Sequence, residues 1–329
     1  MTGFRWVFPR LLASCLLLCG RTPALAESYH VIICGSGGGE PFAEQFEDWG
    51  QRLRAVLIEQ LGKTGENVYL LTESGHDADA VSSVEETEKV FQRVGRNISK
   101  ADDGFVYLVG HGSFRRNVAK LNVPGEDLTA DQLDDWLRRW AARQVVVINT
   151  ASTSGVFVNV LSGKGRIICT STSSAEERNA TRFMGFFISA LEEGSADQNR
   201  DERISVLEIC RQAGALTDAW YANQGYLATE HPLIDDNGDK KGSRVTDMRS
   251  PEMDGKIADQ FYLLDVRVPK GTSPALVDAY QAAIASVEAL VKNKADLDAK
   301  RYLEELEGQL LKAARLNRKI HDGEPQMPD

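Results

Sequence analysis

A histidine and a serine follow two apolar runs, where side chains able to accept protons and attack carbonyl groups would meet. Phe105 to Gly110 is followed by His111 and Gly112, and Val145 to Thr150 is followed two residues later by Ser152. Short β-branched runs bounded by glycine and small polar residues predict buried strands. A base from one strand end and a nucleophile from the next is an arrangement suited to acyl transfer.

Strand and helix patterns alternate along the chain and would place both side chains at one edge of a sheet. Strands are predicted at residues 30–34, 68–72, 105–111, 145–150 and 166–170, with helical periodicity in most of the segments between them. This alternation predicts an α/β fold with a mostly parallel sheet and helices on both faces. Ligands bind at the carboxyl ends of the strands in such sheets, which is where His111 and Ser152 emerge.

Two segments around these residues resemble the catalytic motifs of the legumain-like peptidases, which belong to the caspase–haemoglobinase group of cysteine peptidases. The segments are Leu108-Val109-Gly110-His111-Gly112-Ser113 and Ala151-Ser152-Thr153-Ser154-Gly155, and the resemblance covers roughly residues 28 to 235. It implies a caspase-like fold, with His111 as general base or acid and Gly112 as a backbone donor to an oxyanion hole. It also puts Ser152 at the nucleophile position and Ser154 among the substrate-binding residues, while Thr150 replaces the usual acid.

The residue at position 152 decides what such a site could do, because the resemblance implies a cysteine there. A cysteine near a histidine is partly thiolate at neutral pH, and the thiolate is the attacking species. An alcohol needs a base in direct hydrogen-bond contact, usually oriented by a third group, and no obvious orienting acid follows His111. Losing general-base contact costs roughly a hundred- to ten-thousand-fold in rate. We therefore expect an inactive homologue that keeps a peptide-binding cleft, and an active Ser152–His111 hydrolase is the alternative.

Two arginines after the fifth predicted strand are the remaining candidates for substrate binding. If the resemblance holds, Arg178 and Arg182 lie near the substrate cleft, where either could receive an acidic or polar group. The alternative is that both are solvated side chains at the start of a helix, with their aliphatic stems lying along the surface.

An acidic loop at residues 197–208 has the ligand spacing of an EF-hand calcium loop. Oxygen-bearing side chains occupy loop positions 1, 3, 5, 9 and 12, namely Asp197, Asn199, Asp201, Ser205 and Glu208. Glu202 stands where a glycine normally makes the sharp turn, so a degenerate loop without metal is an equal alternative. The segment 235–239 has similar acid spacing, but Thr246 at position 12 weakens its claim. Apart from calcium at 197–208, the expected function requires no cofactor.

The first 26 residues predict a cleavable export signal with a basic leader, an apolar core at 11–18 and the cleavage site Ala24-Leu25-Ala26. The mature protein would be secreted or periplasmic, and a lipoprotein anchored at Cys15 is the alternative. Removing the leader takes three of 38 basic residues and none of the 48 acidic ones, so the formal charge moves from −10 to about −13. This acidic balance argues against nucleic acid as a partner, and the chain after the leader offers no segment for membrane insertion. A peptide or protein is the expected partner.

The last part of the chain predicts a helical hairpin and tail at residues 273–329, after an α/β domain at 27–240 and a linker and return segment at 241–272. Leucines recur on one face of the second helix, at Leu303, Leu306, Leu310 and Leu311. Packing back onto the α/β domain is favoured because short helices seldom stand alone. The alternative is a separate arm that binds a partner, which would make the chain an envelope or interaction protein.

Overall fold

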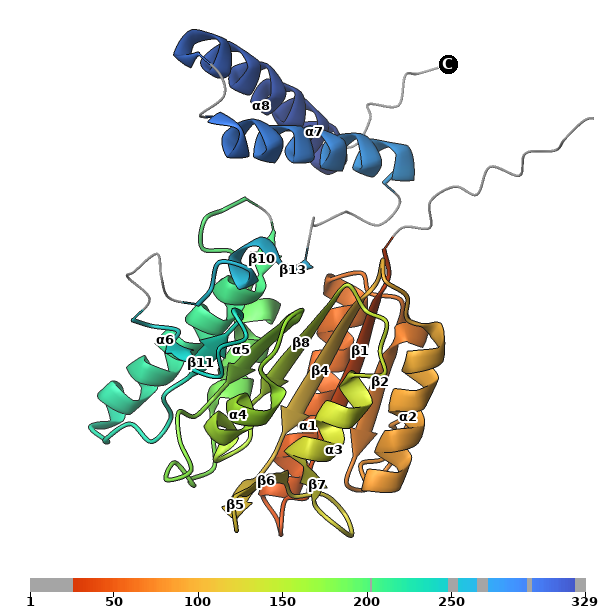
Figure 1. Ribbon diagram of the computed structural model, residues 1–329, viewed down its shortest axis with the longest axis vertical. Helices are drawn as coiled ribbons and strands as arrows, with labels where there is room; N and C mark the ends of the chain where they lie inside the picture. Colours follow the sequence, from red (N-terminus) through yellow and green to blue (C-terminus); the bar gives the residue numbers. More distant parts are fainter. Residues whose placement is uncertain (1–25, 202, 248–253, 265–271, 295–297, 323–329) are drawn as a thin grey trace, which may run out of the picture.

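The structure, a computed structural model, describes residues 26–201, 203–247, 254–264, 272–294 and 298–322. Residues 1–25, which hold nearly all of the predicted export signal, lie outside the described residues. A central sheet of eight strands in the order β12-β11-β9-β8-β4-β1-β2-β3 organises the described part of the chain (Figure 1).

The sheet is mostly parallel, as the sequence predicts. Its strands are β1 (Ser28–Cys34), β2 (Val68–Thr72), β3 (Ala80–Val81), β4 (Asp103–Val109), β8 (Gln144–Asn149), β9 (Arg166–Thr170), β11 (Leu233–Asp235) and β12 (Ser243–Arg244). The six strands from β9 to β3 pair in parallel. The two short strands β11 and β12 add an antiparallel edge beside β9. The predicted α/β class is therefore confirmed.

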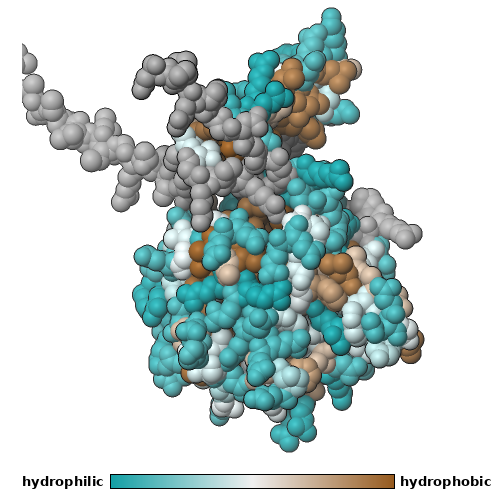
Figure 2. Space-filling model, turned by 180° about the vertical axis from the view of Figure 1, so that it is seen from behind, coloured by the Kyte–Doolittle hydropathy of each residue, from teal (hydrophilic) through white to brown (hydrophobic). Residues whose placement is uncertain are grey.

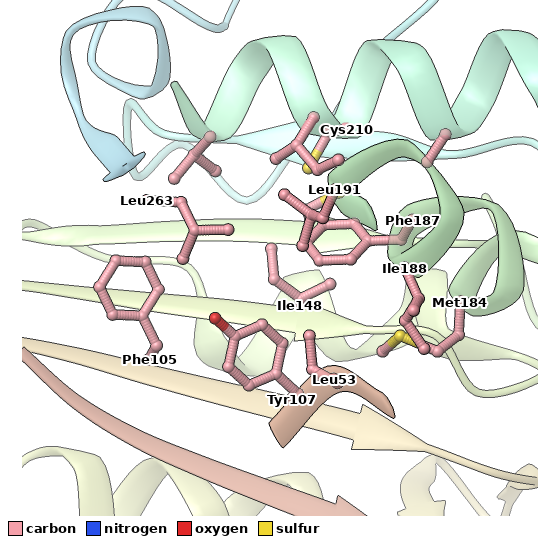
Figure 3. Packing of buried hydrophobic residues seen from close by; sticks show 14 of the residues in the cluster. Leu53, Phe105, Tyr107, Ile148, Met184, Phe187, Ile188, Leu191, Cys210 and Leu263 are labelled. Carbon is pink, nitrogen blue, oxygen red and sulfur yellow. The ribbon is translucent and has the colours of Figure 1, made fainter. Parts of the chain in front are cut away.

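Helices cover both faces of the sheet, which is why its central strands are apolar on both sides. One face carries α1 (Phe42–Ala55), the π-helical turn η1 (Val56–Gln60), α5 (Phe183–Glu192) and α6 (Val206–Gln224), and the other carries α2 (Val84–Asn97), α3 (Ala130–Leu137) and α4 (Val158–Leu161). In β4, Phe105 and Tyr107 face the first layer while Val106 and Leu108 face the second. Figure 3 shows Tyr107 packed under α5. Fully burying one such apolar side chain contributes about 1.5–3 kcal/mol.

A small three-stranded sheet follows β4, where the sequence between Ser113 and Asp127 predicts only a loop. It consists of β5 (Gly112–Arg115), β6 (Val118–Leu121) and β7 (Leu128–Thr129). The turn between β5 and β6 is made by Arg116 and Asn117, both with positive φ (51° and 64°), and a two-residue loop of this kind matches the twist of a hairpin. The hairpin fixes the backbone of Gly112 beside the end of β4.

Residues 225–260, whose Gly-, Asp- and Pro-rich sequence predicts a long loop or linker, also contribute the strands β11 and β12 and the 3-10 helix η4 (Ala258–Gln260). Residues 261–266 are predicted as a last strand or an ordered return, and β13 (Tyr262–Leu264) within them pairs antiparallel with β10 (Ile204–Ser205). The Asp236 carboxylate accepts hydrogen bonds from the backbone N–H groups of Ile257 and Ala258, at 2.8 and 2.9 Å. Because β12 belongs to the central sheet, the sheet extends past residue 240, where we expected the domain to end.

The C-terminal residues form the predicted hairpin from α7 (Pro274–Lys292) and α8 (Ala299–Asp322). The two helices share their own buried cluster, made by Tyr280, Ala283, Ala313 and Ile320, which is separate from the two clusters on the sheet. Figure 1 shows the hairpin beyond the edge where the strands begin, opposite β5, β6 and β7. None of the described helices, these two included, is long and apolar enough to cross a bilayer.

Candidate active site

The predicted catalytic residues lie at the carboxyl ends of two adjacent strands. β4 and β8 pair in parallel, so the residues that follow them leave the sheet at the same edge. After β8, the Thr150 N–H donates to the Leu108 carbonyl at 2.8 Å, which continues the pairing of the two strands by one residue. After β4, Gly110 has φ +145° and turns the chain toward His111. The structure therefore brings Gly112 and Ser152 into direct contact.

The Ser152 hydroxyl is held by the backbone of Gly112. The Gly112 N–H donates to Ser152 Oγ at 3.0 Å, and Ser152 Oγ in turn donates to the Gly112 carbonyl at 3.3 Å. The Ser152 residue is only 1% exposed. Two consequences follow: the hydroxyl proton points at a carbonyl rather than at a base, and the N–H group predicted for an oxyanion hole already has an acceptor.

His111 lies in an aromatic setting beside the start of α1. Its ring meets Phe42 and Phe46 edge-on, with ring centroids 4.8 and 5.1 Å away. Burial lowers the pKa of His111, and a hydrogen bond with the Gly37 backbone offsets part of that effect. Within the described residues, no hydrogen bond joins the imidazole to Ser152. The base and the nucleophile position share an edge of the sheet without the contact that serine chemistry requires.

The turn around Ser152 is tightly packed and locally strained. A Cβ at position 112 would lie 2.3 Å from the Ser152 carbonyl oxygen, so only glycine fits there. Thr153 has φ +56°, which is unfavourable for a β-branched residue. Non-glycine residues held in this conformation cost about 1–3 kcal/mol each and are concentrated at functional sites. The strained turn therefore marks this position as a candidate functional site.

The predicted substrate residue Ser154 is fully buried at the start of the short 3-10 helix η3 (Ser154–Phe157). Its hydroxyl is within hydrogen-bond distance of Ser171 Oγ at 3.2 Å and Thr172 Oγ1 at 3.0 Å, and it accepts from the Thr172 N–H at 3.1 Å. These bonds tie the end of β8 to the end of β9. The Ser154 hydroxyl is therefore hydrogen-bonded to other residues of the protein.

A carboxylate–histidine pair at the same edge was missed by the sequence reasoning. Glu177 is hydrogen-bonded to His231 Nδ1, and it also accepts from the Ser173 N–H at 2.7 Å. The Glu177 carbonyl accepts from the Thr153 N–H at 2.8 Å, which links the pair to the residue after Ser152. A carboxylate on Nδ1 fixes the orientation of an imidazole, as in hydrolase triads. The two residues are 54 positions apart, so spacing gave no signal.

The two predicted substrate-binding arginines lie at the entry to α5. The Arg182 guanidinium stacks on Trp220 at 3.6 Å from the ring centroid, and Arg178 Nε donates to the Ala175 carbonyl at 3.1 Å. Neither side chain forms a hydrogen bond to His111 or Ser152 in the part of the chain that is described.

The start of α5 is held by a buried carboxyl group. The fully buried Glu230 accepts from the N–H groups of Arg182 and Phe183, and burial raises the pKa of this carboxyl group.

In the predicted calcium loop, several oxygen ligands are engaged by the backbone. Ser205 and Glu208 form a capping box at the start of α6, in which each side chain accepts the other's backbone N–H, at 3.1 and 2.9 Å. The Asp201 N–H donates to Asp197 Oδ1 at 3.1 Å and to Asn199 Oδ1 at 2.8 Å. In the described residues no group of three or more His, Cys, Asp or Glu side chains is arranged to hold a metal ion. Calcium at 197–208 stays a prediction.

A large cavity lies at the opposite edge of the sheet. It has a volume of about 950 Å³ and is lined by residues at the strand starts, such as Ser28, Phe105 and Arg143, and by Val291 of α7. It is therefore not the predicted peptide cleft.

Comparisons with known proteins leave the family open. No protein-family model matches the chain, and a search of curated proteins found no match. The case for a function therefore depends on the motifs, the fold class and the geometry around Ser152.

Proposed function

We propose that this protein is an exported, catalytically silent relative of the legumain-like peptidases that binds a peptide or protein at the carboxyl edge of its sheet. The two motifs at His111 and Ser152, on adjacent parallel strands of an α/β fold, support the kinship. The leader sequence supports export.

The hydrogen bonding of Ser152 carries the proposal. An active serine needs its proton accepted by a base and leaves backbone N–H groups open for the substrate oxyanion. Here the Gly112 carbonyl is the acceptor and the Gly112 N–H is already bonded to the hydroxyl. A hydroxyl bonded in this way links two loops and does not attack a peptide.

Peptide turnover by the purified mature protein and its Ser152→Cys variant tests the proposal. With a fluorogenic peptide library we expect no turnover by the wild type. A thiol at position 152 should restore measurable cleavage, because thiolate formation does not need an oriented base in contact. A variant that also carries His111→Ala is the matched control and should lose the gained activity.

Two results would contradict the proposal. Wild-type turnover that Ser152→Ala abolishes would show an active serine. Absence of both peptide binding and cleavage in the folded Ser152→Cys variant would show that no peptide site remains at this edge.

One observation favours the active alternative. The Glu177–His231 pair is an oriented imidazole whose Glu177 backbone is bonded to Thr153, next to Ser152. If His231 served as the base, His231→Ala would abolish hydrolysis that His111→Ala leaves intact. The silent function predicts no hydrolysis in the wild type or in either variant.

A further inference from the structure

The helix α8 exposes three leucines, one of which lies on the side turned away from α7. Ala313 and Ile320 of α8 are buried in the cluster that the two helices share. At 3.6 residues per turn, Leu311 lies about 160° around the helix from Ala313. Leu303, Leu310 and Leu311 are 61%, 48% and 49% exposed, and Figure 2 shows a hydrophobic patch on the hairpin. Leu303 and Leu310 lie only about 80° and 60° from Ala313, on the flank of the helix, so Leu311 is the exposed leucine of the side that faces away from α7.

The charges beside these leucines are arranged symmetrically about Leu311. Glu304 and Glu307 precede it by seven and four residues, while Arg315 and Arg318 follow it by four and seven. On a helical projection these five residues lie within about 80° of one another. From the N-terminal to the C-terminal end of α8, this stripe is therefore acidic, then apolar, then basic, and a helix running the opposite way presents the same groups in reverse order.

Three of the four charges in this stripe have no ion-pair partner among the described residues of their own chain. Glu307, Arg315 and Arg318 are exposed and make no ion pair with any other described residue. Glu304 reaches Lys300 at 3.9 Å, with both side chains mostly exposed. Pairs of this kind contribute little, so Glu304 is available to a better placed partner.

We propose that α8 is a self-association surface that binds α8 of a second copy of this chain in antiparallel orientation. A two-fold axis at Leu311 places Glu304 against the partner's Arg318 and Glu307 against the partner's Arg315. By symmetry each contact occurs twice, as in any interface formed by the same patch on both subunits. The Leu311 side chains of the two helices then meet at the axis.

The charge pattern favours an antiparallel second copy over a parallel copy or a membrane surface. A parallel pair of helices would set glutamates against glutamates and arginines against arginines, which repel. An anionic membrane would attract the arginines but repel the glutamates of the same stripe. A second copy in antiparallel orientation satisfies all four charged positions, and the sequence provides it without another protein.

Charge reversal tests the pairing in the mature full-length protein. We expect sedimentation to show a concentration-dependent dimer. The double variants Glu304→Arg/Glu307→Arg and Arg315→Glu/Arg318→Glu should each weaken self-association at least about tenfold, because four attractive contacts become repulsive. An equimolar mixture of the two variants should regain a dimer, since each supplies the charge that the other needs.

The control variant is Lys312→Glu/Lys319→Glu, which makes the same net charge change on α8 as Arg315→Glu/Arg318→Glu but outside the stripe. It should dimerise like the wild type, and far-UV circular dichroism should show unchanged helix content in all variants. Dimerisation should also weaken as salt is raised, because exposed charge pairs are screened. A wild type that is monomeric up to its solubility limit would overturn the proposal. So would folded charge-reversal variants that fail to recombine, or binding of the wild-type stripe to anionic vesicles in place of itself.

Discussion

Replacing Ser152 with alanine tests whether its hydroxyl serves structure or chemistry. The change leaves the Gly112 N–H without its acceptor at 3.0 Å; Ser152 is only 1% exposed and Gly112 is half-buried. An orphaned buried donor costs about 1–3 kcal/mol. The bond to the Gly112 carbonyl is longer, at 3.3 Å, and its loss adds about 0.5 kcal/mol. We therefore expect the free energy of unfolding to fall by about 1.5–3.5 kcal/mol.

Urea unfolding followed by tryptophan fluorescence measures this loss, provided that the slope of the transition is unchanged. Ser174→Ala is the matched control, because this serine lies in a loop at the same sheet edge and its Oγ accepts only one exposed bond, at 3.4 Å from Glu176. It should change stability by less than about 0.5 kcal/mol.

A Ser152→Ala protein as stable as the wild type would refute the reasoning. Residues kept for catalysis are often neutral or costly for stability, so their removal tends to stabilise a fold. An increase in stability would therefore favour the active alternative.

Three further changes test other parts of the site. Gly112→Ala should cost at least about 3 kcal/mol of unfolding free energy or prevent folding, because the new Cβ would lie against the Ser152 carbonyl oxygen. Gly163→Ala is the control and should be near neutral, because a Cβ at position 163 has no neighbour within 4 Å. Glu230→Ala should lower the unfolding free energy by about 2–4 kcal/mol, since it orphans the Arg182 and Phe183 N–H groups and leaves the Tyr221 hydroxyl with only Thr229 Oγ1 of its two described partners. The folded pKa of His111 lies below 6.5, so the unfolded chain binds the proton more readily and stability falls as pH drops below that value. His111→Asn should therefore lose less stability than the wild type between about pH 7 and pH 5, as measured by urea unfolding, and an identical pH dependence would contradict the lowered pKa.

The long β-branched strands were predictable because their signal is local. The predicted strands at 68–72 and 166–170 match β2 and β9 residue for residue, and the run ending at Asn149 delivers Ser152 to the same edge as His111. The small sheet of β5, β6 and β7 was missed because its strands are two to four residues long and depend on the Arg116-Asn117 turn. The segment after α6 was predicted as a loop because side-chain contacts to the backbone, such as those of Asp236, order it without periodicity.

The site was predictable in position but not in its hydrogen bonding. The sequence placed Gly112 and Ser152 together, yet nothing in the residue types says that the Gly112 backbone satisfies the hydroxyl. Glu177 and His231 meet only because β9 and β11 pair, which is a contact between distant segments. The spacing of Ser205 and Glu208 fits a capping box as well as a calcium loop, since a serine three residues before a glutamate at a helix start forms such a box. The structure shows that capping arrangement.

The reactivity of the Ser152 hydroxyl is the most direct test of the central claim. The purified mature protein is incubated with a serine-directed fluorophosphonate probe, and the modified residue is located by mass spectrometry with Ser152→Ala as the reference. We predict no label at Ser152 in the folded protein, because its proton is held by a carbonyl and no base contacts it. Stoichiometric labelling at Ser152 that is absent from Ser152→Ala would contradict the account.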